Sequence, residues 1–412
     1  MKCRFCDTLL DDPELDNVFL DLGTAPPSNA YLSREMLSAP ELYFPLKLHT
    51  CPQCLLVQID ELQAHTALFS ADYAYFSSYS RSWLEHAERY VADATTRLGL
   101  DGDSFVVEIA SNDGYLLQYM AARGIPCLGV EPAAGTAEVA RARGIETIVE
   151  FFGAGLAHRL SRQRRRADLI IANNVLAHVP DLNDFVAGIA ELLDGQGIAT
   201  IEFPHLQQLV TQRQFDTVYH EHFSYFSLHV LRAVLAAHGL RICDVETLST
   251  HGGSLRVWAA HNASHHRATP AVAAILAGEA SAGMLEMDYY RGFQLQADAV
   301  KNDLLAFLLQ ARRDGLKVGG YGAAAKGNTL LNYAGVRPDL LSYVVDASPH
   351  KQGRYLPGSR IPIVAEQHLR AQQPDLVLIL PWNLREEITT QLSYVRTWGG
   401  RFATAIPNME ID

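Results

Sequence analysis

Residues 219–225 of this 412-residue chain read YHEHFSY, and six of these seven side chains are polar or titratable. Imidazoles, a carboxylate and phenols so close together can move protons or bind a metal ion, and such clusters are concentrated at functional sites. Two interpretations are open. His220 and His222 could be ligands of a metal ion, or one histidine could act as a general base that its neighbours orient.

The metal interpretation of this segment is the weaker one. Catalytic zinc usually has three protein ligands and one open position, and no third histidine or cysteine motif with metal spacing accompanies residues 219–225. A turn inside the segment would direct His220 away from His222, so we assign no role to His220. We therefore favour a single histidine that acts as a base.

Four cysteines near the start of the chain form two CxxC pairs. Cys3 and Cys6 make up the first pair, and Cys51 and Cys54 the second. In a reducing compartment this pattern indicates a structural zinc site rather than disulfides. Four thiolates complete a tetrahedral shell and leave no open position for catalysis. Two unrelated redox-active or free-thiol pairs are the alternative.

A turn after the first strong strand pattern has the features of a cofactor site. Residues 105–110 (FVVEIA) predict a buried strand, and the turn at residues 108–114 (EIASNDG) leads from it into a helix. In a doubly wound fold the ligand binds at the carboxyl end of such a strand, and an acidic residue one strand later bonds the ribose. The GxGxxG fingerprint of a dinucleotide site is absent from the sequence, so S-adenosylmethionine, an adenosyl ligand without a pyrophosphate, fits better. The expected cofactor contacts are Glu108, Ala110, Asn112, Gly114, Glu131, Asn173 and Asn174.

The elements around these motifs predict an α/β protein. Short apolar runs alternate with helical patterns over about residues 100–265, which indicates a mainly parallel, doubly wound sheet with helices on both faces. A second α/β pattern begins at residue 318, after a long amphipathic stretch. Residues 1–65 hold too little apolar sequence for a core without the metal. We expect a zinc-binding domain (1–65), a central cofactor-binding domain (66–265), and linker helices with a C-terminal Rossmann-like domain (266–412).

A second glycine-containing turn lies at residues 320–327 (GYGAAAKG). Backbone amides at a helix N-terminus attract phosphate, and the Lys326 ammonium adds a positive charge. The spacing does not fit a P-loop. We expect Tyr321 and Lys326 to bind the substrate, with the turn holding a nucleotide diphosphate; a Rossmann turn that only packs is the alternative. The turn at residues 251–254 (HGGS) either borders the active site or is a simple hairpin connection.

The composition limits the classes of partner. The formal net charge of −12 argues against binding to nucleic acid. No apolar run approaches the roughly 18 residues that span a bilayer, and the polar start of the chain has no signal-peptide core. We therefore expect a cytoplasmic protein that acts on a small molecule, without a membrane partner. The sequence leaves both a monomer and a dimer open.

The order of these motifs resembles one known family. CRFC and CPQC, then EIASNDG, GVEP, NNVLAHVPD, YHEHFSYFS, HGGSLRVW and GYGAAAKG, follow one another as in the S-adenosylmethionine-dependent nucleotide-sugar C-methyltransferases. The resemblance covers nearly the whole chain. It implies a zinc-binding domain, a central class I methyltransferase domain and a C-terminal Rossmann-like domain, with a dTDP-4-keto-deoxysugar methylated at C-3. Ala110 departs from the pattern, because the family usually has glycine there.

The resemblance also implies roles for five residues. Methylation of a carbon next to a ketone needs a base that removes the proton of that carbon, and donors for the enolate oxygen. The family's base matches His222, with Glu221 assisting it and Tyr219 contacting the sugar ring. His178 matches a histidine suited to the keto or enolate oxygen, and Tyr75 matches a tyrosine that reaches the same site.

Two other functions are open at the level of the sequence. The same cofactor could serve an O- or N-methyltransferase that acts on a sugar or another small metabolite. A zinc-ribbon binding module with a degenerate methyltransferase domain is the other candidate. Ala110 slightly supports this module, whereas the polar YHEH cluster argues against it.

Overall fold

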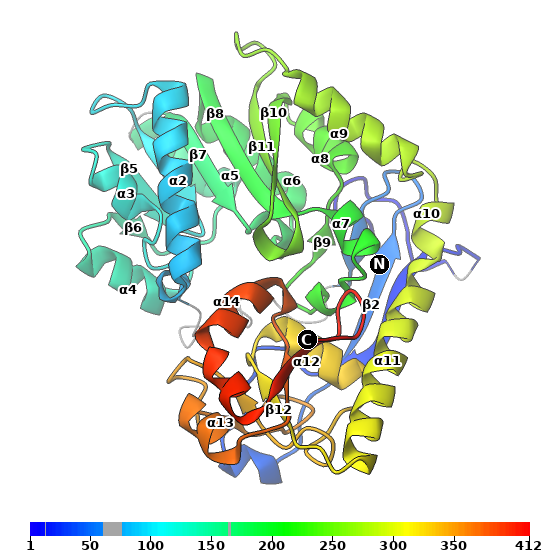
Figure 1. Ribbon diagram of the computed structural model, residues 1–412. Coiled ribbons are helices and arrows are strands. Elements are labelled where there is room, and N and C mark those ends of the chain that lie inside the picture. Colours follow the sequence, from blue (N-terminus) through cyan, green and yellow to red (C-terminus); the bar gives the residue numbers. More distant parts are fainter. Residues whose placement is uncertain (13, 61–75, 164–165) are drawn as a thin grey trace.

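The computed structural model describes residues 1–12, 14–60, 76–163 and 166–412, whose strands form three sheets (Figure 1). The central sheet consists of β4 (Val106–Ile109), β5 (Cys127–Val130), β6 (Thr147–Ile148), β7 (Ala167–Asn173), β8 (Leu193–Pro204), β10 (Leu240–Leu248) and β11 (Ser254–His261). Across the sheet they follow the order β10-β11-β8-β7-β4-β5-β6. Strands β6, β5, β4, β7 and β8 run parallel to one another, and β11 is antiparallel to β8 and β10. The winding direction therefore reverses between β4 and β7, which is where a doubly wound sheet binds its ligand.

Helices cover both faces of the central sheet. In β4, Val106 belongs to one buried cluster, while Val107 and Ile109 belong to another, because successive side chains of a strand point to opposite faces. The first cluster is filled by α2 (Arg81–Leu98), α3 (Leu117–Ala121) and α4 (Ala134–Ala142). The second is filled by α5 (Ala154–Gln163), α6 (Leu182–Leu192) and α8 (Leu228–Ala237).

Local signals fix the ends of the helices nearest the sequence motifs. The Ser80 hydroxyl accepts a hydrogen bond from the Trp83 N–H at the start of α2, and Gly99 ends this helix in the left-handed conformation. Asp181 caps α6 by accepting from the Asp184 N–H. This cap anchors the chain just after the AHVP turn, and so fixes where that turn meets the sheet.

The first sheet is antiparallel and includes a strand from far along the chain. Its strands are β1 (Val18–Ala25), β2 (Phe44–Thr50), β3 (Val57–Ile59) and β9 (Ser224–Tyr225), in that order. Val57 pairs with Tyr225, and Gln58 with Ser224. The end of the 219–225 segment therefore belongs to the same sheet as β2 and β3, which flank the second CxxC pair.

The third sheet has the order β14-β13-β12-β15-β16-β17, in which only β17 is antiparallel to its neighbour. Connecting helices α9 (Pro270–Ser281), α10 (Asp288–Arg291) and α11 (Phe293–Arg313) lead to it, and Phe293 stacks on Phe19 of β1 with ring centroids 4.9 Å apart. The sheet itself contains β12 (Val318–Tyr321), β13 (Val344–Val345), β14 (Ile363–Val364), β15 (Leu376–Ile379), β16 (Arg401–Thr404) and β17 (Glu410–Ile411), with helices α12 (Ala325–Tyr333), α13 (Glu366–Gln372) and α14 (Arg385–Gln391).

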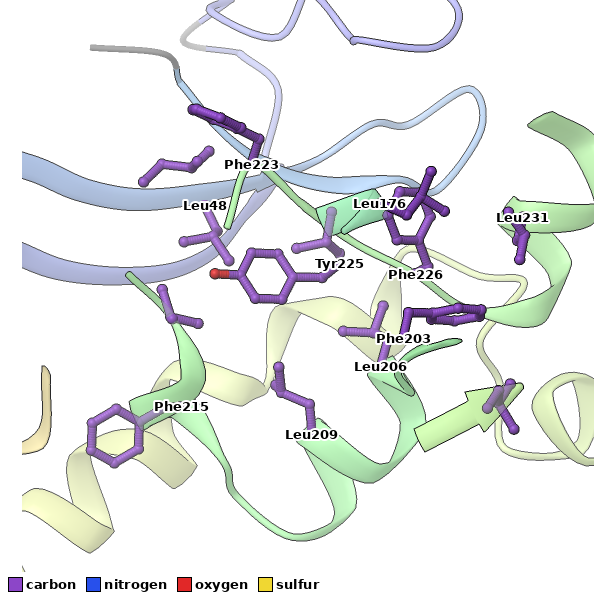
Figure 2. Close-up of a cluster of buried hydrophobic side chains, with 14 of the residues drawn as sticks. Leu48, Leu176, Phe203, Leu206, Leu209, Phe215, Phe223, Tyr225, Phe226 and Leu231 are labelled. Atoms are coloured by element: carbon purple, nitrogen blue, oxygen red, sulfur yellow. The ribbon is translucent and has the colours of Figure 1, made fainter. Parts of the chain in front are cut away.

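One buried apolar cluster connects the three sheets, since it contains Leu48 of β2, Phe203 of β8 and Leu330 of α12. Figure 2 shows part of this cluster, with the Tyr225 ring among leucine side chains from separate segments. Phe226 is fully buried beside Phe203, with ring centroids 5.9 Å apart. The residues that follow the YHEH motif are therefore core residues.

The predicted fold class is confirmed. The central doubly wound sheet, the cysteine module and the second parallel sheet all occur where the sequence predicts them. The domain boundaries at residues 65 and 265 stay predictions. In the described part of the chain, no helix has both the length and the apolar character needed to cross a membrane.

Candidate active site

The four cysteines predicted to bind zinc converge on one point. Their sulfur atoms all lie within 4.8 Å of one another, with 3.5 Å between Cys3 and Cys54 and 3.5 Å between Cys6 and Cys51. Tetrahedral zinc with ~2.3 Å bonds to sulfur would place its ligands about 3.8 Å apart. The Gln58 amide donates to the Cys3 sulfur at 3.3 Å. The donor set thus fits a structural zinc ion.

The two halves of the zinc site have the same backbone turn. Asp7 and Leu55 each directly follow a CxxC pair, and both adopt the left-handed conformation, with φ of 59° and 66°. The Asp7 N–H donates to the Cys3 carbonyl at 3.1 Å, and the Leu55 N–H donates to the Cys51 carbonyl at 2.8 Å. The left-handed conformation is unfavourable for residues other than glycine. The contacts around Asp7 and Leu55 must therefore stabilise both turns.

His222 has the geometry of a neutral imidazole base. Its Nδ1 lies 2.9 Å from the Thr217 carbonyl oxygen, which can only accept, so Nδ1 carries the hydrogen and Nε2 the lone pair. Burial, and then the nearby His178, hold the pKa of His222 well below its ordinary value. The Tyr219 ring packs on the imidazole with centroids 4.0 Å apart. His222 is therefore unprotonated at neutral pH.

His178 lies beside His222, with ring centroids 4.7 Å apart at 68°. Its Nδ1 donates to the backbone carbonyl of Glu221 at 2.8 Å. Burial lowers the pKa of His178 to about 4, against the opposing effect of this hydrogen bond. Two neutral imidazoles thus lie side by side, and their expected roles as base and oxygen contact stay predictions.

Glu221 is a buried carboxyl group that faces the first sheet. Its Oε1 accepts from the Asn29 amide at 2.6 Å, and burial raises the pKa of Glu221 to about 7 in spite of that bond. The Tyr31 hydroxyl, 3.4 Å from the Asn29 Oδ1, donates to the Ala323 carbonyl at 2.6 Å. Asn29 and Tyr31 escaped the sequence analysis, because a lone amide and a lone phenol in a polar loop carry no spacing signal.

The metal interpretation of residues 219–225 finds no support in the described residues. His220 is buried and points to the start of β2, where its Nε2 lies 3.3 Å from the Phe44 carbonyl and 3.2 Å from the Pro45 carbonyl. Among the residues described, the four cysteines are the one group of three or more side chains that could hold a metal. Tyr75 lies outside the described residues.

The predicted cofactor turn has an unusual backbone. Ala110, Asn112 and Gly114 all have positive φ, of 57°, 50° and 77°. A Cβ on Gly114 would lie 3.2 Å from Ile145 and 3.3 Å from Ala140, so this position needs glycine. Ala110 adopts the left-handed conformation that glycine adopts without strain.

Acidic side chains surround this turn. Glu131 accepts from the backbone N–H groups of Asn112 and Ala133, each at 2.9 Å, and burial raises its pKa. Burial also raises the pKa of Glu108 well above its ordinary value. Both residues lie at carboxyl ends of neighbouring parallel strands, as the predicted cofactor site requires.

Unpaired polar atoms mark the space between the strand ends. Buried side-chain atoms without a hydrogen-bond partner include Glu108 Oε2, Ser111 Oγ, Asn173 Oδ1 and both polar atoms of Asn174. Buried polar groups are nearly always paired in folded proteins. These atoms suit the amino-acid and ribose groups of S-adenosylmethionine, so the residues present fit the cofactor.

Lys326 faces the candidate base from the C-terminal sheet. Its ammonium donates to the Asn383 side chain at 2.7 Å and lies 4.7 Å from the centre of the Trp382 ring. Burial lowers the pKa of Lys326, although the Asp216 carboxylate opposes this shift. The positive charge of Lys326 also contributes to the lowered pKa of His222.

Asp216 is a site residue that the sequence analysis missed. Its Oδ2 accepts from the Trp382 indole at 2.8 Å, its Oδ1 is unpaired, and burial raises its pKa to about 6. Trp382 also packs on Gly252, where a Cβ would lie 2.4 Å from the indole. The HGGS turn therefore lies at the contact between the central and C-terminal sheets, and His251 in it has a pKa lowered by burial to about 4.

Neighbouring side chains pack closely against the glycines of the 320–327 turn and leave no room for a Cβ. A Cβ on Gly320 would lie 2.8 Å from Val344, and one on Gly322 would lie 2.3 Å from Pro381. Tyr321 belongs to the apolar core of the C-terminal sheet, and its hydroxyl accepts from the Gln391 amide at 3.1 Å. Tyr321 therefore packs in the core of the C-terminal sheet, and the expected contacts of Tyr321 and Lys326 with the substrate stay predictions.

Three family models match the chain in sequence. They describe a zinc binding domain at residues 3–69, a methyltransferase domain at 83–245 and a C-methyltransferase C-terminal domain at 249–407. The C-methyltransferase NovU of Streptomyces niveus is 36% identical over 410 residues, which is 100% of this chain and 96% of that protein.

Other matches are partial. The ubiquinone biosynthesis O-methyltransferase of Bartonella quintana (strain Toulouse) is 29% identical over 94 residues, 23% of this chain and 38% of that protein. The magnesium protoporphyrin IX methyltransferase of Synechocystis, solved with S-adenosylmethionine, is 16% identical and covers 43% of this chain and 79% of its own, with a TM-score of 0.34.

Proposed function

The chain belongs to the C-methyltransferase family, and we propose that it methylates a carbon next to the ketone of a nucleotide sugar, at C-3 of a dTDP-4-keto-deoxysugar. The enzyme is an S-adenosylmethionine-dependent methyltransferase with a structural zinc site. The observation that carries the proposed reaction is the pair of neutral imidazoles, His222 and His178, with Nε2 of His222 available as a proton acceptor.

The first step is removal of a proton from the carbon next to the ketone. Nε2 of His222 takes this proton, and the electron pair of the broken C–H bond passes into the enolate. The low pKa of His222 keeps it unprotonated before the step, and the Thr217 carbonyl stabilises the imidazolium that forms. S-adenosylmethionine, when bound, supplies the electrophilic methyl group that the carbon takes up.

The enolate oxygen needs donors or positive charge in its surroundings. The resemblance assigns His178 to this oxygen; its Nδ1 hydrogen is bound to the Glu221 carbonyl, so its Nε2 can donate only once the ring is protonated. The Lys326 ammonium adds positive charge from α12. Glu221 titrates near neutrality, so it holds a proton at slightly acidic pH and can assist proton movement. We propose that Tyr219, whose ring packs against His222 with centroids 4.0 Å apart, contacts the sugar ring.

The residues for the two ligands come from different sheets. Glu131, Asn173, Asn174 and the turn at residues 108–114 would hold the cofactor at the switch point of the central sheet. We propose that Lys326 pairs with the diphosphate of the substrate. The net charge of −12 supports a small-molecule substrate rather than nucleic acid, and we propose that the enzyme works in the cytoplasm.

Isotope labelling tests this proposal. The purified enzyme is incubated with methyl-¹³C S-adenosylmethionine and a dTDP-4-keto-deoxysugar, and the product is examined by NMR. The expected product carries the label on C-3, and in D₂O the enzyme exchanges the C-3 proton even without methyl donor. A label on oxygen or nitrogen, without such exchange, would favour an O- or N-methyltransferase instead.

A further inference from the structure

Arg4 joins the zinc site to both segments that carry the candidate catalytic histidines. It lies between Cys3 and Cys6, inside the first zinc-binding turn. Its Nη1 donates to the Pro180 carbonyl at 2.9 Å, and its Nη2 donates to the Ile59 carbonyl at 2.9 Å. One guanidinium thus links two parts of the chain that are more than a hundred residues apart.

The same guanidinium lies over the ring of Phe223, 4.9 Å from its centre. Phe223 directly follows His222 and is fully buried. Its N–H donates to the Ala177 carbonyl at 2.6 Å, and its carbonyl accepts from the Ile59 N–H at 3.1 Å. Arg4 therefore contacts the residue next to the base, and also the strand that this residue pairs with.

Pro180 lies two residues after His178, in the turn that α6 follows. The Asn183 amide donates to the backbone carbonyl of Phe5 at 3.0 Å, so a second contact joins α6 to the first zinc-binding turn. The two histidine segments, at residues 177–180 and 219–223, are thus held against each other and against this turn.

The zinc-binding turn holds Arg4 rigidly. The Arg4 N–H donates to the Gln58 side chain at 2.9 Å, and the Gln58 amide donates to the Cys3 sulfur at 3.3 Å. Gln58 pairs with Ser224 through β3 and β9. A zinc ion on the four thiolates would fix Cys3 and Cys6 on either side of Arg4. A shift of this turn would therefore move Arg4 and its contacts with Pro180 and Phe223.

We propose that Arg4 is a positioning residue for the methyl transfer reaction, through which the zinc site sets the placement of His222 relative to His178. This inference rests on the proposed function. A planar guanidinium can donate to two carbonyls and cover an aromatic ring at the same time, which the single ammonium of lysine cannot do. A misplacement of about 1 Å in a catalytic group can cost about 100-fold in rate.

The test compares Arg4→Ala with Lys2→Ala, which removes a positive charge from an exposed neighbour in the same turn. For each zinc-loaded protein, three quantities are measured: bound zinc, hydrogen exchange of residues 175–181 and 219–226, and the steady-state constants. We expect Arg4→Ala to keep its zinc and its KM for both substrates. We expect exchange in the two segments to rise about 10-fold or more, kcat to fall about 10- to 100-fold, and exchange at residues 108–114 to stay unchanged.

Arg4→Lys keeps the side-chain stem and the charge, so it provides the same test if Arg4→Ala loses zinc. It should give smaller changes in the same two segments. Unchanged exchange there in a zinc-loaded Arg4 variant, or faster exchange with wild-type kcat, would overturn the proposal. Because the exchange measurement needs no substrate, this outcome is distinct from a wild-type enzyme that fails to methylate a keto nucleotide sugar.

Discussion

His222 donates its Nδ1 hydrogen to the backbone carbonyl of Thr217 across 2.9 Å, and this bond leaves Nε2 as the proton acceptor of the ring. Thr217 ends a 3-10 turn (Phe215–Thr217) that also contains Asp216, which the Trp382 indole holds from the C-terminal sheet. The orientation of the candidate base therefore depends on a contact between sheets.

His222→Gln should abolish methyl transfer and C-3 proton exchange while leaving the affinity for S-adenosylhomocysteine unchanged. Glutamine keeps a polar group of similar size but cannot act as a base near neutral pH, so kcat should fall about 10²- to 10⁴-fold. Product formation and calorimetry measure the two quantities. The exposed His265 provides a control, His265→Gln, which should behave as wild type. Full activity of His222→Gln would remove His222 from the mechanism.

Glu221 should make the protein less stable as pH rises. Its folded pKa of about 7 lies above its ordinary value of 4.5, so the folded state binds more protons than the unfolded state between these two values. The free energy of unfolding should therefore fall by about 3 kcal/mol from pH 4.5 to 7, relative to a protein without this group.

The comparison is between wild type and Glu221→Gln, by denaturant unfolding across this pH range. The difference in unfolding free energy between them should shrink as pH rises and level off above pH 7. Glu14→Gln, at an exposed carboxyl, should show no such trend. A difference that grows with pH would mean that Glu221 is ionised in the folded protein.

In the cofactor turn, replacing Ala110 by glycine and Gly114 by alanine should have different effects on stability. Ala110 has a φ of 57°, which costs an L-residue about 1–2 kcal/mol. Ala110→Gly removes this strain but adds about 0.4–1 kcal/mol of unfolded-state entropy, so it should be neutral or stabilise by up to about 1.6 kcal/mol. Gly114→Ala should destabilise and weaken S-adenosylhomocysteine binding, because its Cβ meets Ile145 and Ala140. Thermal unfolding and calorimetry measure both. Destabilisation by Ala110→Gly would show that the alanine methyl packs favourably.

Local patterns allowed much of this fold to be predicted from sequence. The predicted strand at 105–110 corresponds to β4 (Val106–Ile109), and the apolar runs predicted over residues 100–265 form the central sheet, because short apolar runs and their turns are set locally. The two CxxC pairs predicted the metal site for the same reason.

Contacts between distant segments could not be predicted in this way. β9 has two residues, too few for any periodic pattern, and its partner β3 lies more than 160 residues earlier in the chain. The contacts of Glu221 with Asn29 and of Asp216 with Trp382 join residues 192 and 166 positions apart. Such pairs depend on how whole sheets pack, which propensity does not encode.

Removal of zinc should loosen the N-terminal sheet first. A chelator, or Cys6→Ser, leaves charged or unpaired thiols close together and frees the two turns around them. We expect a lower melting temperature and faster hydrogen exchange in residues 44–59. Cys127→Ser is the matched control, since Cys127 lies outside the quartet. Equal exchange with and without zinc would mean that the sheet forms without the metal.

The bond between Trp382 and Asp216 should stabilise the contact between the central and C-terminal sheets. Trp382→Phe leaves a fully buried carboxyl group without its indole donor, which should cost about 1–3 kcal/mol in urea unfolding. Trp398→Phe loses a similar bond to a neutral acceptor, the Pro374 carbonyl, and should cost less, about 0.5–1.5 kcal/mol.

A double-mutant cycle separates this bond from the packing of the indole. Asp216→Asn keeps an acceptor for Trp382 but removes the buried charge. Trp382→Phe should therefore lower the free energy of unfolding less in the Asp216→Asn background than in wild type. The difference is the part of the interaction that depends on the charge, and it should be about 1 kcal/mol or more. Strict additivity would show that the Asp216 charge contributes nothing to this contact, which Trp382 would then stabilise through a neutral hydrogen bond and its packing on Gly252.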